Sequence, residues 1–237
     1  MRTAPLGGAA AALAATILLS SCGVLSDDDA FLEQAPREIA KVAFKEMRQL
    51  SSMRVLGTVD DDQLGPMRVD LKIDASDACV GSLHTGRGNL DFVQNAKGAW
   101  FRGDERFLRS LSGATEQTAA TLGRSWFEAG KDDDLSRLCS WRDLVGDFRV
   151  AKDDTVERID EDEVEEVGGA DAVPITGRDG KEPTTAWVSV KAPHRVLKMA
   201  PLRTTGEIEE LYFEEFDLDV VARTPPRKDI VGLPRRP

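Results

Sequence analysis

Residues 67–74 read Met67-Arg68-Val69-Asp70-Leu71-Lys72-Ile73-Asp74, so every second residue is apolar and every residue between is charged. Strict alternation of this kind places the apolar side chains on one face of a β-strand and the charged ones on the other. The stretch therefore predicts a half-buried strand, and it is the strongest strand signal in the chain. A partner strand is expected over residues 55–59, with residues 60–66 as the hairpin loop.

Three more short strands are expected after this hairpin, over residues 79–83, 89–94 and 99–102, separated by two glycine-containing turns. Five strands at this spacing favour an antiparallel meander with one apolar face. Strand patterns return after Lys152, over residues 155–159, 164–176, 184–190, 195–199, 207–214 and 216–221. The stretch 224–237 contains four prolines and is expected to be an extended tail.

An amphipathic helix of about 14 residues is predicted to begin at Pro36, because proline suits the first turn of a helix. Its apolar residues recur at helical spacing, at Ile39, Val42, Ala43, Met47 and Leu50. Basic residues lie between them, at Arg37, Lys41, Lys45 and Arg48. This basic face suits either contact with lipid headgroups or simple exposure to solvent, and the sequence leaves both open.

The middle of the chain, residues 104–148, has apolar residues at helical spacing interrupted by Gly113, Gly123 and Gly130. This pattern predicts two or three short helices. If Cys79 is bonded to Cys139, the last of these helices is attached to the strand over 79–83, so we expect the helices to lie against the sheet and not to form a second domain.

The N-terminus carries a different kind of signal. Residues 6–19 are an uncharged run rich in alanine and leucine, too short to span a bilayer comfortably and typical of a signal-peptide core. The run ends in Leu19-Ser20-Ser21-Cys22, which resembles a bacterial lipobox closely. The resemblance implies that residues 1–21 are removed, that Cys22 becomes the acylated first residue, and that residues 22–35 form a tether to the domain over 36–223. A secretory signal with a chance cysteine, or an uncleaved anchor, is the alternative.

The charge composition argues against two classes of binding partner. The formal net charge is −11, which argues against sequence-independent binding of nucleic acid and against attraction to an anionic membrane surface. A membrane-bound form of this chain therefore depends on the acyl chains of Cys22 for its anchoring.

The cysteine count predicts a disulfide. Cys22 is used by the lipobox, so Cys79 and Cys139 remain as an even pair in an oxidising compartment. Two free thiols are the alternative. A zinc site is less favoured, because His84 and His194 lack the paired spacing of metal ligands. Neither histidine lies in a recognisable catalytic motif, so no enzyme and no cofactor is expected.

The order of helix, strands, helical insertion and strands resembles the LppX/LprG type of actinobacterial lipoprotein, which is similar in fold to the carriers LolA and LolB. The resemblance rests on Cys22, Val55-Leu56-Gly57-Thr58-Val59, Cys79-Val80-Gly81, Trp100, Cys139, Val167-Gly168-Gly169 and Phe216. It implies an α+β fold, in which a curved antiparallel β half-barrel closes over an N-terminal helix and a helical insertion on its concave face. It also implies a hydrophobic cavity between sheet and helices that holds acylated molecules.

The expected lining of that cavity is apolar and comes from the strands and the helical insertion, at Val69, Leu71, Ile73, Leu83, Leu90, Phe92, Trp100, Leu122, Trp126 and Phe127. We therefore expect a lipid-anchored protein of the extracytoplasmic membrane face that binds a lipid or glycolipid as carrier, chaperone or sensor. The same residues equally suit a filled core, in which case the protein is a structural or protein-interaction module of the envelope.

Overall fold

The structure is a computed structural model that describes residues 27–61, 65–112, 115–129, 136, 138–146, 148–150, 154–159, 163–178, 183–201 and 210–232. The expected leader and the expected lipid attachment site at Cys22 lie outside these residues. Among the helices within the described ranges, none is both long and apolar enough to cross a membrane.

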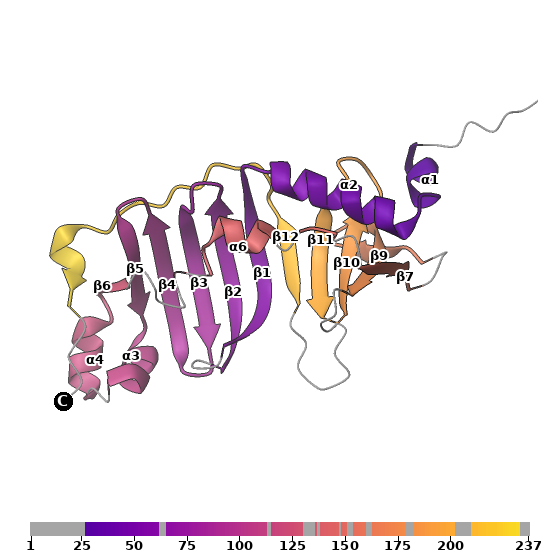
Figure 1. Ribbon diagram of the computed structural model, residues 1–237. Coiled ribbons are helices and arrows are strands. Elements are labelled where there is room, and N and C mark those ends of the chain that lie inside the picture. The colour runs from indigo at the N-terminus through magenta and orange to yellow at the C-terminus, as the bar shows by residue number, and fades with distance from the viewer. Residues whose placement is uncertain are drawn as a thin grey trace, which may run out of the picture.

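The described strands form one 13-stranded sheet that curves around the helices and does not close into a barrel (Figure 1). Neighbouring strands are antiparallel, except that β13 runs parallel to β6. In order across the sheet, the strands are β13 (Ile230–Val231), β6 (Trp126–Ala129), β5 (Gly98–Gly103), β4 (Gly88–Asn95), β3 (Cys79–Thr85), β2 (Gly65–Asp74), β1 (Ser52–Asp61), β12 (Leu211–Glu214), β11 (Val196–Pro201), β10 (Thr184–Ser189), β9 (Ala170–Arg178) and β7 (Thr155–Arg158), with β8 (Glu165–Val167) beside β9. The predicted α+β class with a curved antiparallel half-barrel is confirmed.

The alternating stretch 67–74 forms most of β2, which pairs with β1 on one side and β3 on the other. Its four apolar residues are all buried, whereas the charged residues between them are not. We call the face that carries Leu71 and Phe92 the inner face, and the opposite face the outer face. The helices α2 and α6 lie on the inner face (Figure 1).

The predicted amphipathic helix is present as α2 (Pro36–Gln49), and its buried side includes Ile39, Ala43 and Met47. It packs against β7, β10 and β11. Ahead of it lies a short helix that the sequence did not predict, α1 (Asp27–Leu32), so part of the expected tether is helical. Phe31 fixes α1 to the sheet, because its ring is buried and stacks on His194 with the centroids 3.6 Å apart.

The helical insertion contains α3 (Glu105–Ser112), α4 (Glu116–Leu122) and α6 (Trp141–Gly146). It also contains β6, which corrects the expectation of helix around Trp126 and Phe127. The four residues of β6 alternate between the two faces and pair with the free edge of β5. A strand this short is easily mistaken for helical spacing, because Leu122 lies four residues before Trp126.

The second half of the chain departs from the predicted strands at two places. The single strand expected over 164–176 is divided into β8 and β9 by a turn at Gly168 and Gly169, which both have positive φ. No strand forms over 216–221, although the residues alternate, because Glu215 and Asp217 adopt positive φ and turn the chain away from β12. The segment then continues past Thr224 to a 3-10 helix (Arg227–Asp229) and β13, so the expected tail is partly structured.

Candidate ligand-binding site

Seven of the ten expected cavity residues lie together on the inner face. Strand register places Leu71, Gly81, Phe92, Phe101 and Phe127 side by side across five strands. Each of the seven is at most 3% exposed: Val69, Leu71, Ile73, Leu83, Leu90, Phe92 and Phe127. The inner face is thus one continuous apolar surface on this half of the sheet.

Of the remaining three expected residues, the two tryptophans need correction. Trp100 pairs with Val93 and with Glu128, so its side chain lies on the outer face, opposite to Phe92 and Phe101. Trp126 also points outward, where the Arg102 guanidinium lies 4.9 Å from the centre of its ring. Neither tryptophan can line a cavity on the inner face. Leu122 lies on α4, where it is half-buried against the core.

Aromatic residues that the sequence did not single out fill part of the inner side. Phe101 packs against Phe127 with ring centroids 5.5 Å apart. Phe148 lies between Phe44 of α2 and Phe213 of β12, at 5.8 Å and 5.5 Å. In β5, Trp100 and Phe101 are adjacent aromatic residues, so one lies on each face and alternation does not tell which. The pairing of Phe101 with Phe92 shows that Phe101 lies on the inner face.

A disulfide fixes α6 to the inner face. Cys79 at the start of β3 is bonded to Cys139, with 5.7 Å between the two Cα atoms. Just after it, the backbone N–H of Trp141 donates a hydrogen bond to Asp77 Oδ1 at 2.8 Å. The Cys79–Cys139 disulfide closes a loop of 60 residues. On the loop-entropy model, this loop raises the free energy of the unfolded chain by about 4 kcal/mol.

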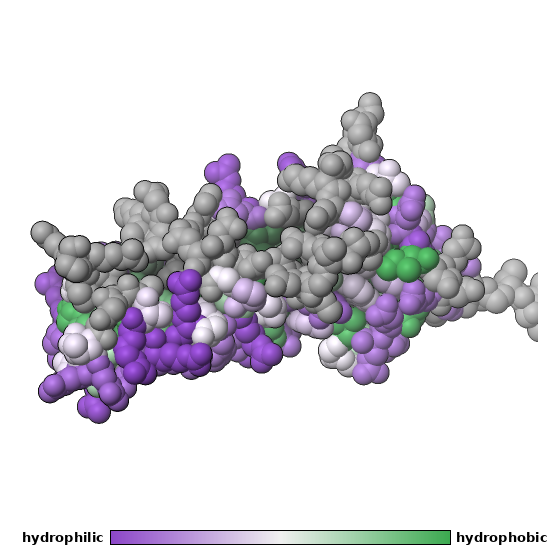
Figure 2. All heavy atoms as spheres, turned by 90° about the horizontal axis from the view of Figure 1, so that it is seen from below, coloured by the Kyte–Doolittle hydropathy of each residue, from purple (hydrophilic) through white to green (hydrophobic). Residues whose placement is uncertain are grey.

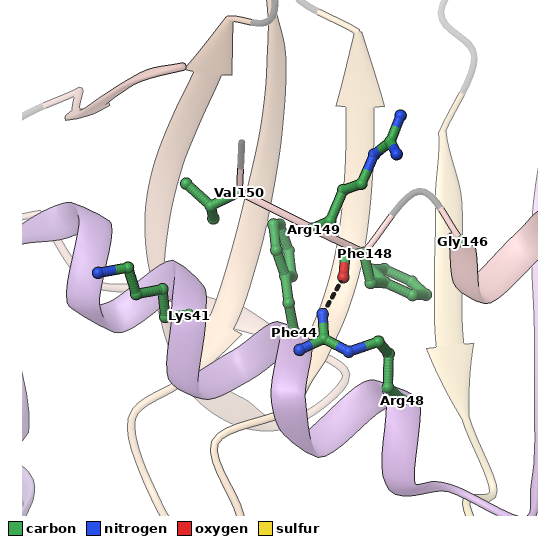
Figure 3. A pocket seen from close by; sticks show the side chains of 7 residues that line it. All are labelled: Lys41, Phe44, Arg48, Gly146, Phe148, Arg149 and Val150. Carbon is green, nitrogen blue, oxygen red and sulfur yellow. Dashed lines mark hydrogen bonds between the residues drawn. The ribbon is translucent and has the colours of Figure 1, made fainter. Parts of the chain in front are cut away.

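A pocket of about 390 Å³ opens where α2 meets the segment that follows α6. Its lining is Lys41, Phe44, Arg48, Gly146, Phe148, Arg149 and Val150. Figure 3 shows the two phenylalanine rings between Arg48 and Val150, with the charged ends of Lys41 and Arg149 pointing away from the rings. Arg48 donates a hydrogen bond to the backbone carbonyl of Phe148, which ties the segment to α2. The pocket combines an apolar floor with three cationic side chains.

The outer face is polar. Figure 2 shows hydrophilic residues gathered along the lower side of the view, over the half of the molecule that holds β2–β5. Arg54 pairs there with Asp70, and its hydrogen bond is the main reason that the pKa of Asp70 lies below its ordinary value. Next to β12, the hydrogen bond from Lys198 lowers the pKa of Glu210 in the same way. Charged strand faces of this kind suit exposure to water and not contact with acyl chains.

No group of three or more metal-ligating side chains occurs within the described ranges. His84 hydrogen-bonds to the side chain of Asn89, and His194 to the carbonyl of Ser189, so both histidines take part in local structure.

No family model matches the chain, and no curated protein matches its sequence. Among solved structures, LprF from Mycobacterium bovis matches 80% of this chain and 96% of its own, with 14% sequence identity and a TM-score of 0.54. The chain has the fold of LprF. Two others match at lower TM-scores, so no inference is drawn from them: an uncharacterised conserved protein from Thermus thermophilus (14% identity, 84% and 99% coverage, TM-score 0.39) and a LolA superfamily protein from Nitrosomonas europaea (11%, 82% and 96%, 0.24).

The match to LprF confirms the resemblance to LppX/LprG-type proteins at the level of the fold. It covers nearly all of LprF, so it is not confined to a single hairpin or helix. At 14% identity it speaks for the arrangement of sheet and helices alone, and the chemistry of a site must come from this chain's own residues.

Proposed function

We propose that this protein is a lipoprotein, anchored to the extracytoplasmic face of the cell membrane through acylated Cys22, that binds the acyl chain of an amphiphile between the inner face of its sheet and helices α2 and α6. Its role is that of a lipid carrier, chaperone or sensor. The lipobox-like stretch before Cys22 supports the anchor. The fold of LprF, a lipoprotein of the LppX/LprG type, supports the ligand class.

The seam between the two helices is the observation that carries this proposal. α2 packs on the β7, β10 and β11 side of the sheet, whereas α6 is held to β3 by the disulfide. The two helices are therefore held to different strands, and the pocket lined by Phe44 and Phe148 opens where α2 meets the segment after α6. From this pocket, Phe148 leads inward to Phe213 on β12. An acyl chain that enters here meets apolar side chains from the surface to the inner face.

A filled core is the second candidate, and burial favours it. Seven expected cavity residues are at most 3% exposed and belong to one packed cluster. In this case the protein binds another protein of the envelope and no lipid. A bulky substitution distinguishes the two candidates. If a lipid is bound, a larger side chain on the inner face displaces it, whereas the same change on the outer face leaves it in place.

Native mass spectrometry tests lipid binding. The full mature chain with Cys22→Ser, exported behind a secretory leader, carries no acyl chain of its own. We expect lipid to co-purify in near-stoichiometric amount, and to be lost from Leu71→Trp, whose new ring fills the inner face. Leu56→Trp is the matched control, because Leu56 pairs with Asp70 and Tyr212 on the outer face. A protein that purifies without lipid and ignores added phospholipids and glycolipids supports the filled core instead.

The anchor has its own test. In cells given an alkyne analogue of palmitate, we expect the wild-type protein to take up the label and to sediment with membranes. Cys22→Ser removes the only proposed attachment atom, so the label is lost and the protein moves to the soluble extracytoplasmic fraction, because two or three acyl chains provide most of the membrane affinity. Equal labelling of both proteins contradicts the anchor and leaves the lipid-binding proposal in place.

A further inference from the structure

We infer that the pocket at the seam of α2 and α6 binds the anionic headgroup of the lipid, and that the protein selects anionic over neutral lipids. This inference rests on the proposed function, because it places the headgroup of the same ligand whose acyl chain lies at the inner face. It concerns the pocket lined by Lys41, Phe44, Arg48, Phe148, Arg149 and Val150.

Charge is the first argument. The chain as a whole is acidic, at −11, yet the charged residues that line this pocket in the described part of the chain are Lys41, Arg48 and Arg149. Arg48 donates to a neutral backbone carbonyl, which leaves its positive charge uncompensated by that bond. Arg149 is exposed and forms no ion pair with any residue of the described ranges. Three cationic side chains around one opening favour a ligand with a negative charge.

Among the described residues, one carboxylate forms an ion pair with a cation of this pocket. Glu38, one turn before Lys41 on α2, accepts a salt bridge from Lys41 Nζ at 2.6 Å. Both side chains are about half exposed, at 50% and 54%, so the pair is weak and is easily exchanged for a phosphate. Lys41 and Arg149 are long, flexible side chains, and they can turn toward a bound group once Lys41 leaves Glu38.

The apolar floor is the second argument, and it separates a lipid from a small anion. Phe44 and Phe148 meet with ring centroids 5.8 Å apart, and Val150 lies beside them. A free phosphate gains nothing from two aromatic rings. A phospholipid whose phosphate lies among the cations instead places the start of its acyl chains on this floor, from which Phe148 continues to Phe213 of β12.

The aromatic residues of the pocket lead into the protein, which favours a lipid taken out of the bilayer over one that remains in it. Phe148 is 1% exposed and Phe213 is 3% exposed, so the aromatic path leads into the protein. A surface that inserts into a membrane presents its aromatic side chains outward, toward the headgroup region.

Lipids that differ only in headgroup charge test the inference. The mature chain with Cys22→Ser is titrated with phosphatidylglycerol and with phosphatidylcholine of the same acyl chains, and bound lipid is counted by native mass spectrometry. We expect phosphatidylglycerol to bind about tenfold more tightly, the effect of two or three charge contacts near a protein surface. The double variant Lys41→Gln with Arg149→Gln is expected to lose this preference and still bind phosphatidylcholine. Arg48 is left unchanged, because it also holds the chain at Phe148.

A control with the same change of net charge is available. Arg87 and Lys97 are exposed residues of the β3–β4 and β4–β5 turns, away from the pocket. Arg87→Gln with Lys97→Gln is expected to keep the tenfold preference. Loss of the preference in this control overturns the inference, because net charge alone then explains it.

The remaining outcomes separate the two proposals. Equal affinity of the wild-type chain for both lipids overturns the headgroup site and leaves the lipid-binding function standing. Failure to bind either lipid refutes the proposed function itself. Attachment to phosphatidylglycerol vesicles without removal of a lipid molecule, shown by separating protein from vesicles before the mass measurement, identifies a membrane-surface site and overturns the inference.

Discussion

Among single residues, Arg54 on the outer face forms ion pairs with three carboxylates. Its Nε and Nη2 atoms donate to the two oxygens of Asp70 at 2.8 Å and 2.7 Å. Its Nη1 atom donates to Glu214 at 2.8 Å and to Glu215 at 2.9 Å. One guanidinium thus holds carboxylates from β2 and from the end of β12, on both sides of β1. The bond to Asp70 raises the pKa of Arg54 further above its ordinary value.

Replacing Arg54 by leucine is expected to lower the free energy of unfolding by about 1–2 kcal/mol at pH 7, because it leaves three carboxylates close together. The loss is modest, since the Asp70 side chain is 37% exposed and water screens the pair. Arg54 lowers the pKa of Asp70, so the ionised pair stabilises the fold above the ordinary value of 3.8, and this contribution disappears as the pH falls through the lower folded value.

Urea unfolding at pH 7 and at about pH 3 measures this difference. The gap between wild type and Arg54→Leu is expected to narrow at the acidic pH. Arg87→Leu removes an exposed arginine of a turn and is expected to have little effect at either pH. A gap of equal size at both values contradicts an electrostatic origin and indicates lost packing of the arginine stem.

Sequence alternation predicted which face these residues occupy but not which partners they have. Arg54, Asp70 and Lys72 all fall at the polar positions of the first hairpin, as the pattern around 67–74 indicates. Glu214 and Glu215 are about 160 residues away along the chain. They reach Arg54 only because β12 pairs with β1, a non-local pairing that no local pattern records.

At the scale of elements, two glycines allow the sheet to curve. Gly57 on β1 and Gly81 on β3 lie on the inner face, at the register of Val69 and Leu71. A Cβ atom at Gly57 would lie 1.8 Å from the carbonyl oxygen of Glu210, and one at Gly81 would lie 2.0 Å from that of Asp70. The backbone of the next strand therefore occupies the space of a side chain, which brings neighbouring strands together on the concave side.

Gly57→Ala is expected to lower the free energy of unfolding by about 3 kcal/mol, because the neighbouring backbone must move to admit a methyl group. Gly57 also has a φ of +153°, which alanine rarely adopts. Gly177→Ala is the matched control, since Gly177 lies on β9 and a Cβ there meets nothing within 4 Å. Denaturant unfolding of both variants tests the claim, and similar losses would argue that β propensity, and not crowding, determines the effect.

The pattern of each strand decides how much of the candidate site the sequence predicts. Clean alternation in β2 assigned Val69, Leu71 and Ile73 to the inner face correctly, because every polar residue between them is charged. In β5, Trp100 and Phe101 are both apolar, so alternation cannot choose between them, and the structure turns Phe101 inward. Trp126 and Phe127 follow Leu122 at helical spacing, so the sequence predicts a helix there. Their strand has only four residues, which is too short for alternation to show. Local patterns identify faces only where the two faces differ in polarity.

At the scale of the whole molecule, the C-terminal segment joins the two halves of the sheet. After β12 the chain runs past the ends of the strands to the far edge, where β13 pairs with β6 (Figure 1). On the way, Asn95 Nδ2 donates to the carbonyl of Ala222 at 2.9 Å and to Thr224 Oγ1 at 3.1 Å. Pro225 is buried, although its surroundings in the sequence resemble a tail. A two-residue strand and single hydrogen bonds leave no periodic signal, so the sequence could not predict this contact.

Asn95→Ala tests whether this contact holds the segment in place. The variant loses both hydrogen bonds to the segment and the one that Asn95 Oδ1 accepts from Lys97, so we expect faster hydrogen exchange over residues 222–231 and a global loss of only about 1 kcal/mol. Lys97→Ala, which keeps the backbone donor, is expected to leave exchange unchanged. If exchange in Asn95→Ala stays slow, the pairing of Ile230 with Trp126 is strong enough to hold the segment, and the parallel strand, not the asparagine, protects the edge of β6 from pairing with other chains.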